Sequence, residues 1–179
     1  MTEAKTKSVN MTFRALYSYI INTNYRNVSG YFSIFISVAS LACAFIFWNS
    51  FATGTKIMLI LIGLIFTVLN PLMLAFKAFK QLKLSPSYKK PIEYTFYDDG
   101  IKVSQGDLSD TLPWNRISAL MLTKHMLAIY TSRIHAFVIP VSELGDDGPK
   151  ILASVVQFTS QYNPKISNSL KRFQSGKGL

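Results

Sequence analysis

The residues that most often carry out catalysis are few in this chain and stand apart in its sequence. His125 and His135 are the only two histidines among 179 residues, and neither lies in a motif such as H-E-x-x-H. Both are expected near turns or strand ends, as surface residues. Hydrolysis or group transfer needs a nucleophile with a base, a metal cluster or paired carboxylates. The sequence therefore predicts a protein that is not an enzyme.

Two carboxylate pairs and one cysteine complete the set of reactive side chains. Asp98 with Asp99, and Asp146 with Asp147, are each followed by glycine and lie between expected elements, so turn formation explains them without a cation. Cys43 is the only cysteine, which rules out a disulfide within the chain and a cysteine-based metal site. It is expected to be a small apolar packing residue. No metal or other cofactor is predicted.

Two uncharged runs dominate the first half of the chain. Residues 31–51 form one run, and at 1.5 Å per residue its 21 residues extend roughly 31 Å as a helix, the hydrocarbon thickness of a bilayer. Residues 57–76 form the second run after a five-residue turn. Each run lacks the polar stripe of a globular surface helix, and Tyr31 and Trp48 lie near opposite ends of the first. A transmembrane helical hairpin is therefore predicted over 31–76, in preference to two buried helices of a soluble protein.

Basic residues flank this hairpin and predict its orientation. Before it the chain carries four cations and one acid, and the turn between the runs has only Lys56. After it come Lys77, Lys80, Lys83, Lys89 and Lys90 in the basic linker 77–91. The positive-inside rule then places both termini in the cytoplasm of a multi-pass cell-membrane protein. Anionic headgroups are the expected partners of these lysines, at about 1 kcal/mol each.

The distribution of charge also argues against nucleic acid as a partner. The formal net charge is +10, but residues 1–91 hold ten Lys or Arg and one acid, whereas residues 92–148 hold four Lys or Arg and eight acids. The basic excess thus borders the predicted membrane hairpin instead of covering a folded domain. No nucleic-acid binding is expected.

Small and polar residues within the two runs are expected to pack the hairpin. They form one stripe on each helix: Ser33, Ser37, Ser40 and Ala44 on the first, and Gly63, Thr67 and Asn70 on the second. Pro71 cannot donate to the carbonyl of Thr67, so the second helix should bend there. Two helices alone cannot enclose a transport path, so Asn70 and Pro71 are interpreted as packing and kink residues unless the protein forms a homo-oligomer.

The segment 1–30 is predicted to be a cytoplasmic N-terminal region with a possible amphipathic helix. Residues 1–8 are polar and expected to be mobile. A helix can begin at Phe13 with Thr12 as its N-cap and end near residues 22–24. Three interpretations remain open: a helix in the membrane interface, a helix docked on the C-terminal domain, or a short strand in which Val9, Met11 and Phe13 alternate with polar residues.

After Pro91 the sequence pattern changes and predicts short strands joined by tight turns. Strands are predicted at residues 93–97, 101–105, 111–112, 117–123, 126–131 and 136–139, with turns at 98–100, 106–107, 124–125 and 132–133. A helix should open at residues 147–149 and end at Asn163, before a flexible tail at 164–179. The predicted fold is an α+β membrane protein, in which a small antiparallel barrel-like domain with a C-terminal helix, residues 92–163, follows the hairpin. This is the plan of a pleckstrin-homology-like domain.

Several short motifs recur in a fixed order in this half of the chain. They are YTFYDDGI at 94–101, VSQG at 103–106, LPW at 112–114, LAIYTS at 127–132 and AFVIP at 136–140. Together with the two preceding runs, they make the chain resemble the YcxB-like family of bacterial membrane proteins. The resemblance implies a cytoplasmic pleckstrin-homology-like domain behind a membrane hairpin. It implies no reaction and no catalytic residue.

A membrane-anchored interaction or regulatory protein is the predicted function, with an unknown protein partner. Inositol lipids are disfavoured as ligands because the first hairpin loop offers Asp98 and Asp99 instead of cations. Trp114 either anchors the core or contacts a groove that receives a peptide. The alternative function is a self-protection (immunity) or transport accessory protein of the membrane, an analogy at the level of fold alone.

Overall fold

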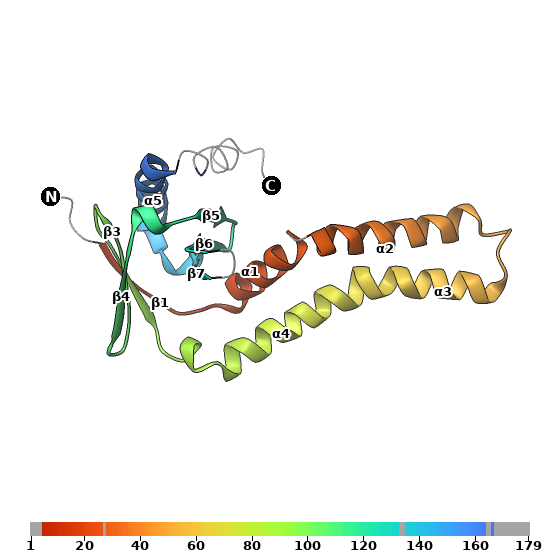
Figure 1. Cartoon of the computed structure of the whole chain (residues 1–179). Coiled ribbons are helices and arrows are strands. Elements are labelled where there is room, and N and C mark those ends of the chain that lie inside the picture. Colours follow the sequence, from red (N-terminus) through yellow and green to blue (C-terminus); the bar gives the residue numbers. More distant parts are fainter. Residues whose placement is uncertain (1–4, 27, 133–134, 164–165, 167–179) are drawn as a thin grey trace. The chain divides into compact units, whose positions relative to one another are not determined.

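The structure is a computed structural model that describes residues 5–26, 28–132, 135–163 and 166 (Figure 1). The chain divides into two compact units. The β unit joins Met1–Ser18 to Leu82–Leu179, and the helical unit is Tyr19–Gln81. The helical unit is therefore an insertion in the chain of the β unit. The predicted tail at 164–179 lies outside the described residues except for Ile166.

Seven strands of the β unit, among the residues that the structure describes, form two antiparallel sheets. The first sheet has the order β1-β2-β3-β4 and the second the order β5-β6-β7. Their bounds are β1 Lys5–Val9, β2 Ile92–Phe96, β3 Gly100–Gln105, β4 Leu108–Pro113, β5 Ala119–Leu122, β6 Met126–Tyr130 and β7 Ala136–Pro140. The predictions of an α+β fold and of strands from residue 92 onward are confirmed.

The first strand corrects the prediction of mobility for residues 5–8, whereas residues 1–4 of that prediction lie outside the described residues. β1 pairs antiparallel with β2, with Lys5 opposite Phe96 and Val9 opposite Ile92. Figure 1 shows β1 at the red end of the chain in the same sheet as the green strands β3 and β4. Val9 is buried at the end of this strand. Because β1 and β2 are neighbours, the helical unit connects two adjacent strands of one sheet.

The hairpin between β3 and β4 is closed by residues 106 and 107, as the sequence predicts. Gly106 has φ +60°, a left-handed conformation that glycine adopts without the steric cost of a side chain. At the other end of β3, a Cβ on Gly100 would lie 2.5 Å from the carbonyl oxygen of Leu112. Glycine at this position therefore permits the close approach of β3 and β4.

The core of the β unit combines residues from both sheets and from the C-terminal helix. That helix, α5 (Gly148–Tyr162), has Pro149 in its first turn, where the missing N–H is tolerated. It buries Ile151 and Val155, which are four residues apart on one face. The buried cluster is Val9, Tyr94, Ile101, Leu112, Trp114, Ile117, Leu120, Leu127, Ile129, Ile139, Leu144, Ile151, Val155 and Ile166.

The helical unit differs in its boundaries from the two predicted runs. α2 is Val28–Ile46, and a turn follows where the run 31–51 predicts further helix. α3 (Thr53–Leu64), a π-helical segment (Ile65–Leu69) and α4 (Asn70–Leu84) form one 32-residue helix. This helix replaces the predicted run 57–76 and takes in Lys77, Lys80 and Lys83, which the sequence places in a linker.

Among the described residues, one helix by itself is long and apolar enough to cross a membrane, namely Thr53–Leu84. A second candidate exists only if the bent pair Phe13–Arg26 and Gly30–Ile46 counts as one span. The structure thus supports one or two apolar helices of spanning length.

The N-terminal helix begins as predicted and ends later. α1 is Phe13–Tyr25, and the Thr12 hydroxyl accepts a hydrogen bond from the Ala15 amide at 3.3 Å, as an N-cap does. Within the β unit, Leu16 is buried and the Ser18 hydroxyl lies 3.2 Å from that of Thr123. Of the interpretations left open by the sequence, docking on the C-terminal domain therefore describes the first half of α1.

Candidate functional site

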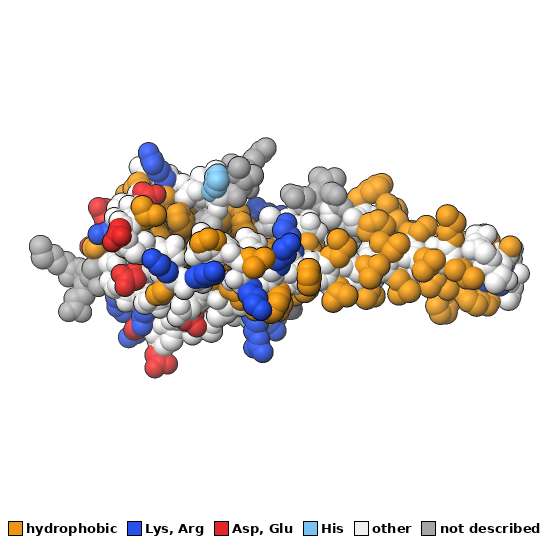
Figure 2. Space-filling model, turned by 90° about the horizontal axis from the view of Figure 1, so that it is seen from below, with side chains coloured by type: hydrophobic (Ala, Val, Ile, Leu, Met, Phe, Trp, Pro, Cys, Tyr) orange, Lys and Arg blue, Asp and Glu red, His pale blue; other side chains and the backbone are white. Residues whose placement is uncertain are grey.

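The helical unit exposes many large apolar side chains. Phe45 is 85% exposed, Phe35 68% and Met73 69%, although such side chains are usually buried in a water-soluble protein. Figure 2 shows hydrophobic side chains crowded over the helical unit. The other large exposed ones include Tyr31, Phe32, Val38, Ile46, Ile57, Met58, Leu61, Val68, Leu72 and Phe76. A contiguous apolar surface of this kind marks contact with a membrane or a partner.

The small-residue stripes of the two helices face each other, as predicted. The Ser37 hydroxyl donates to the carbonyl oxygen of Gly63 at 2.9 Å and also hydrogen-bonds the Thr67 hydroxyl. Ser37 and Ala44 are buried. A Cβ on Gly63 would lie 2.5 Å from Leu41 carbons, so the two backbones approach because this residue is glycine. The polar groups of the hairpin interior thus satisfy each other.

Asn70 and Pro71 lie at the junction between the π-helical segment and α4. The segment ends at Leu69, directly before Asn70. π-Helical turns interrupt α-helices at strained or functional positions. The Asn70 side-chain amide donates to the Tyr25 hydroxyl at 3.4 Å, which joins α4 to α1. The sequence singles out Asn70 and Pro71 but identifies neither the π-helical segment nor Tyr25.

A hollow with both polar and apolar lining opens beside Asn70 within the helical unit. It has a volume of about 370 Å³. Its lining is Asn24, Gly30, Ser33, Ile65, Phe66, Leu69, Asn70 and Met73, which come from α1, α2, the π-helical segment and α4. A Cβ on Gly30 would lie 2.6 Å from the Asn24 carbonyl oxygen, so only glycine fits at the corner between α1 and α2. We name this feature the helical hollow.

Two further features of the helical unit lie outside the helical hollow: a cation–π contact near the α2–α3 turn, and Cys43. Lys56 Nζ lies 4.9 Å from the centre of the Trp48 ring, within the range of a cation–π contact. Cys43 is exposed and does not pack inside the chain, which corrects its predicted role. Its side chain belongs to the apolar outer surface.

Trp114 anchors the core of the β unit. The residue is 1% exposed and sits in a short 3-10 turn after β4. Its indole N–H donates to the carbonyl oxygens of Tyr97, at 3.2 Å, and Asp98, at 3.1 Å. Its ring stacks on Phe158 of α5, with centroids 5.6 Å apart. Of the two roles that the sequence leaves open, core anchoring is confirmed.

A small cleft nevertheless adjoins Trp114, between the end of the first sheet and α5. Its volume is about 60 Å³, enough for one small side chain but below the size of a typical ligand pocket. Its lining is Lys5, Phe96, Tyr97, Asp98, Trp114, Ile151, Ser154, Val155 and Phe158. We name this feature the Trp114 cleft. Lys5 and Phe158 are contributors that the sequence does not identify.

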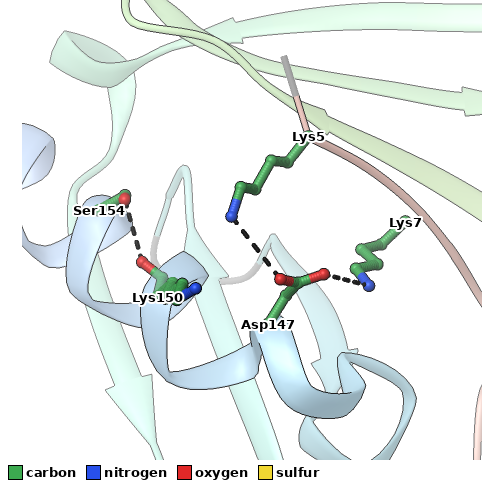
Figure 3. A network of polar contacts seen from close by, with 5 residues as sticks. All are labelled: Lys5, Lys7, Asp147, Lys150 and Ser154. Atoms are coloured by element: carbon green, nitrogen blue, oxygen red, sulfur yellow. Dashed lines mark hydrogen bonds and ion pairs between the residues drawn. The ribbon is translucent and has the colours of Figure 1, made fainter. Parts of the chain in front are cut away.

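An ion-pair cluster joins β1 to the start of α5 (Figure 3). Lys7 Nζ lies 2.8 Å from one oxygen of Asp147, and Lys5 Nζ lies 3.7 Å from the other. The hydrogen bond from Lys7 and the positive charges of Lys7 and Lys5 lower the pKa of the Asp147 carboxyl. Asp147 therefore links β1 to the start of α5 through contacts with two lysine side chains.

The two histidines lie in different turns. His125 is in the turn between β5 and β6, where its amide donates to the Thr123 hydroxyl at 3.3 Å. His135 is exposed, and it lines an open hollow of about 640 Å³ together with Asp110, Arg116 and four further residues. Within the described residues, no group of three or more His, Cys, Asp or Glu side chains is placed to hold a metal ion.

The lysines predicted to meet anionic headgroups are all exposed. Lys77, Lys80 and Lys83 project from α4, and Lys89 and Lys90 follow it. Lys77 and Lys80 follow Met73 by four and seven residues, so the three side chains line up along one side of the helix. This row of lysines therefore begins beside the helical hollow.

Comparisons with known proteins bear on the β unit. No significant match was found among curated proteins or among solved structures. Residues 96–151 match a family model described as YcxB-like protein. The matched segment runs from the end of β2 into the first turns of α5 and contains Trp114. The family indicated by the sequence motifs is thereby confirmed, and this chain carries a YcxB-like region at residues 96–151.

Proposed function

We propose that this chain is a membrane-anchored interaction or regulatory protein that acts through protein contacts. In this proposal, the helical unit crosses the cell membrane as a hairpin. The β unit is a pleckstrin-homology-like domain, and both chain termini are cytoplasmic. Bilayer anchoring and partner contact are then assigned to separate parts of one polypeptide.

The observation that carries the proposal is the exposed apolar surface of the helical unit. Burying such side chains is favourable by roughly 1.5–3 kcal/mol for each residue moved fully out of water, so leaving this surface in water would be strongly unfavourable. The polar groups of Ser37 and Thr67 instead pair in the interior, as groups in hydrocarbon must. Lipid is therefore the solvent that best suits this surface.

The charges support the proposed orientation. Lys56 lies in the first turn of α3, whereas Lys77, Lys80 and Lys83 lie in the second half of α4. Cytoplasmic ends of membrane helices carry an excess of lysine and arginine. We therefore assign the turn to the outer side and the β unit to the cytoplasm.

Reporter fusions test the membrane topology. Alkaline phosphatase, which is active only after export, is fused at Gly54 in one variant and after Leu179 in another. We expect activity from the fusion at Gly54 and none from the fusion at the C-terminus. Activity of the C-terminal fusion would reverse the assigned orientation, and inactivity of both fusions would contradict the hairpin.

The β unit supplies the proposed contact surface. Two antiparallel sheets and a C-terminal helix around one core agree with a pleckstrin-homology-like plan. The Trp114 cleft offers an apolar floor with Lys5 and Asp98 at its side, which suits one anchoring side chain of a protein partner. This role in binding is separate from the core role of Trp114.

Affinity capture tests the contact role of this cleft. Ser154 lines the cleft and is exposed, so Ser154→Trp should fill it, whereas Ala153→Trp adds the same ring at an exposed position of α5 that does not line the cleft. We expect proteins captured by the detergent-solubilised chain to be lost with Ser154→Trp and kept with Ala153→Trp. Equal capture by both variants would remove the cleft from the proposed function.

A further inference from the structure

The helical hollow combines polar and apolar lining in a part of the chain that is otherwise apolar outside. Asn24, Ser33 and Asn70 contribute amide and hydroxyl groups, and Ile65 and Leu69 contribute aliphatic surface. Its volume of about 370 Å³ falls within the range of roughly 300–1,000 Å³ common for small-molecule sites. A matching ligand therefore has hydrogen-bonding groups next to hydrocarbon, and oxygen acceptors satisfy the N–H donors of the two amides.

Two lysines that follow the hollow along the helix indicate the charge of that ligand. Lys77 follows Asn70 by seven residues, which places it about 10 Å further along the same face of α4. Met73, at the rim of the hollow, is followed by Lys77 and Lys80 on the same side of the helix. Lysine side chains near helix ends reach toward the membrane interface. The order along the helix from Thr53 to Leu84 is thus aliphatic lining, then amide, then ammonium groups.

We propose that the helical hollow binds one anionic glycerophospholipid. The ester and glycerol oxygens accept hydrogen bonds from the side-chain amides of Asn24 and Asn70, the phosphate faces Lys77 and Lys80, and the acyl chains follow Ile65 and Leu69. Basic pockets between membrane helices on the cytoplasmic side bind anionic headgroups in this manner. The inference rests on the proposed membrane insertion of the helical unit and adds a specific ligand to it.

A second copy of the chain fits the hollow less well than a lipid does. Two copies in one membrane share the same orientation, so a two-fold interface through this face would place Lys77 and Lys80 of one copy against the same residues of the other. Like charges at an interface are repulsive. An anionic headgroup instead neutralises these lysines.

Lipid binding can be measured on the full-length chain by native mass spectrometry from detergent. Phosphatidylglycerol is the anionic probe and phosphatidylcholine the zwitterionic one. We expect the chain to retain phosphatidylglycerol in preference, and Lys77→Gln with Lys80→Gln to weaken this retention about tenfold, as expected for lost hydrogen bonds to a charged group. Lys56→Gln, at the other end of the same helix, is the charge-matched control and should retain the lipid. Equal retention of the two lipids, or equal loss in the control, would overturn the proposal.

Photo-crosslinking locates the lipid without relying on a variant that could misfold. A photoreactive phenylalanine replaces Met73 at the rim of the hollow, or Phe45, which is 85% exposed elsewhere on the helical unit. In vesicles that contain both lipids, we expect adducts of phosphatidylglycerol mass enriched at position 73 over position 45. Equal adducts at both positions, or a dimer adduct at position 73, would overturn the lipid site.

Vesicle flotation separates the proposed membrane insertion from the proposed lipid site. A chain that fails to float with vesicles lacks the membrane anchor. A chain that floats but gives no selective adducts lacks only the lipid site.

Discussion

Trp114 shows how one side chain can link the sheet, the turn and the helix of the β unit. Its indole N–H is shared between the carbonyl oxygens of Tyr97, which ends the first predicted hairpin strand, and Asp98, which begins the predicted turn. Its ring meets Phe158 of α5. A tryptophan after a strand is visible in the sequence, but its partner on α5 is 44 positions away and is set by tertiary packing alone. The sequence therefore identifies the residue and leaves its role open.

Truncating Trp114 should destabilise the β unit severely. Trp114→Ala removes a buried ring and should lower the free energy of unfolding by about 3–5 kcal/mol. Trp114→Phe keeps an aromatic ring but leaves two carbonyl oxygens without their donor, at about 1–2 kcal/mol. Urea unfolding followed by circular dichroism measures both. Trp48→Phe, in the exposed turn of the helical unit, is the control and should leave this transition unchanged. A similar loss for Trp48→Phe and Trp114→Ala would contradict the assignment.

Tyr94 should make the β unit sensitive to alkali. Its phenol is buried, and this burial raises its pKa above the ordinary value of about 10, with a smaller contribution from Tyr88. The folded state then favours the neutral phenol, so its stabilising contribution is complete below about pH 10 and is lost as pH rises further. The free energy of unfolding should fall by up to about 1.4 kcal/mol per pH unit above that point.

Tyr94→Phe separates this residue from the other groups that ionise at high pH. The variant lacks the titrating phenol, so its free energy of unfolding should depend less steeply on pH between about pH 10 and 12. Denaturant titrations of both proteins at matched pH values provide the measurement. Parallel pH profiles for the two proteins would show that the buried phenol does not titrate with folding.

At the scale of elements, the hairpin interface depends on one close backbone approach. Gly63 on α3 faces Leu41 on α2, and a Cβ at Gly63 would lie 2.5 Å from carbons of that side chain. Gly54, in the first turn of α3, has open space where its Cβ would be. The two glycines of one helix therefore form a matched pair for substitution.

Gly63→Leu should separate α2 from α3, whereas Gly54→Leu should be tolerated. The first variant forces the helices apart and breaks the hydrogen bond from Ser37 to the Gly63 carbonyl oxygen, at a cost of about 1–3 kcal/mol for overpacking. The thermal aggregation midpoint of the detergent-solubilised chain should drop for Gly63→Leu alone. If both variants lowered it equally, close packing at Gly63 would not be the cause.

Sequence reasoning locates this interface well and the helix boundaries less well. Stripes of serine, alanine and glycine are local patterns, and they identify which faces of the two helices meet. The end of α2 at Ile46 and the start of α3 at Thr53 depend on where the chain can turn, and no charge marks these points in an apolar run. Pro71 lacks the amide N–H that would bond the Thr67 carbonyl oxygen, so it interrupts the hydrogen bonds of the α-helix. A π-helical segment is only one of several ways in which a helix accommodates such an interruption.

At the scale of the whole molecule, the chain is organised as one unit inserted into another. The strands from Ile92 onward are predictable because short turns connect them and their alternation is local. β1 cannot be predicted in this way, because its partner β2 is distant in the sequence. Even the pair with the smallest separation, Val9 and Ile92, is 83 residues apart. Its sequence, KTKSV, offers only one apolar residue. Pairing over such a separation is fixed by the completed sheet, and the solvent-exposed ion pairs of Asp147 add little to it.

This topology predicts that the two sheets and α5 can be separated from the helical unit if β1 is retained. Val9 and Ile92 are opposite each other at the end of the β1–β2 pairing, so a short glycine-rich loop can replace the helical unit together with its flanking residues 11–18 and 82–90. We expect a chain of residues 1–10, such a loop and residues 91–179 to be water-soluble, monomeric and cooperatively folded. Residues 91–179 alone leave the edge of β2 unpaired and Asp147 without Lys5 and Lys7.

Gel filtration and thermal unfolding compare the two chains directly. The linked chain should elute as a monomer with a sharp transition, and residues 91–179 should aggregate or unfold at lower temperature. A third chain with Lys7→Gln in the linked background isolates the contribution of the ion pair, which should be small because the pair is solvent-exposed. Equal stability with and without residues 1–10 would show that β1 is dispensable, and the helical unit would then be an N-terminal anchor instead of an insertion.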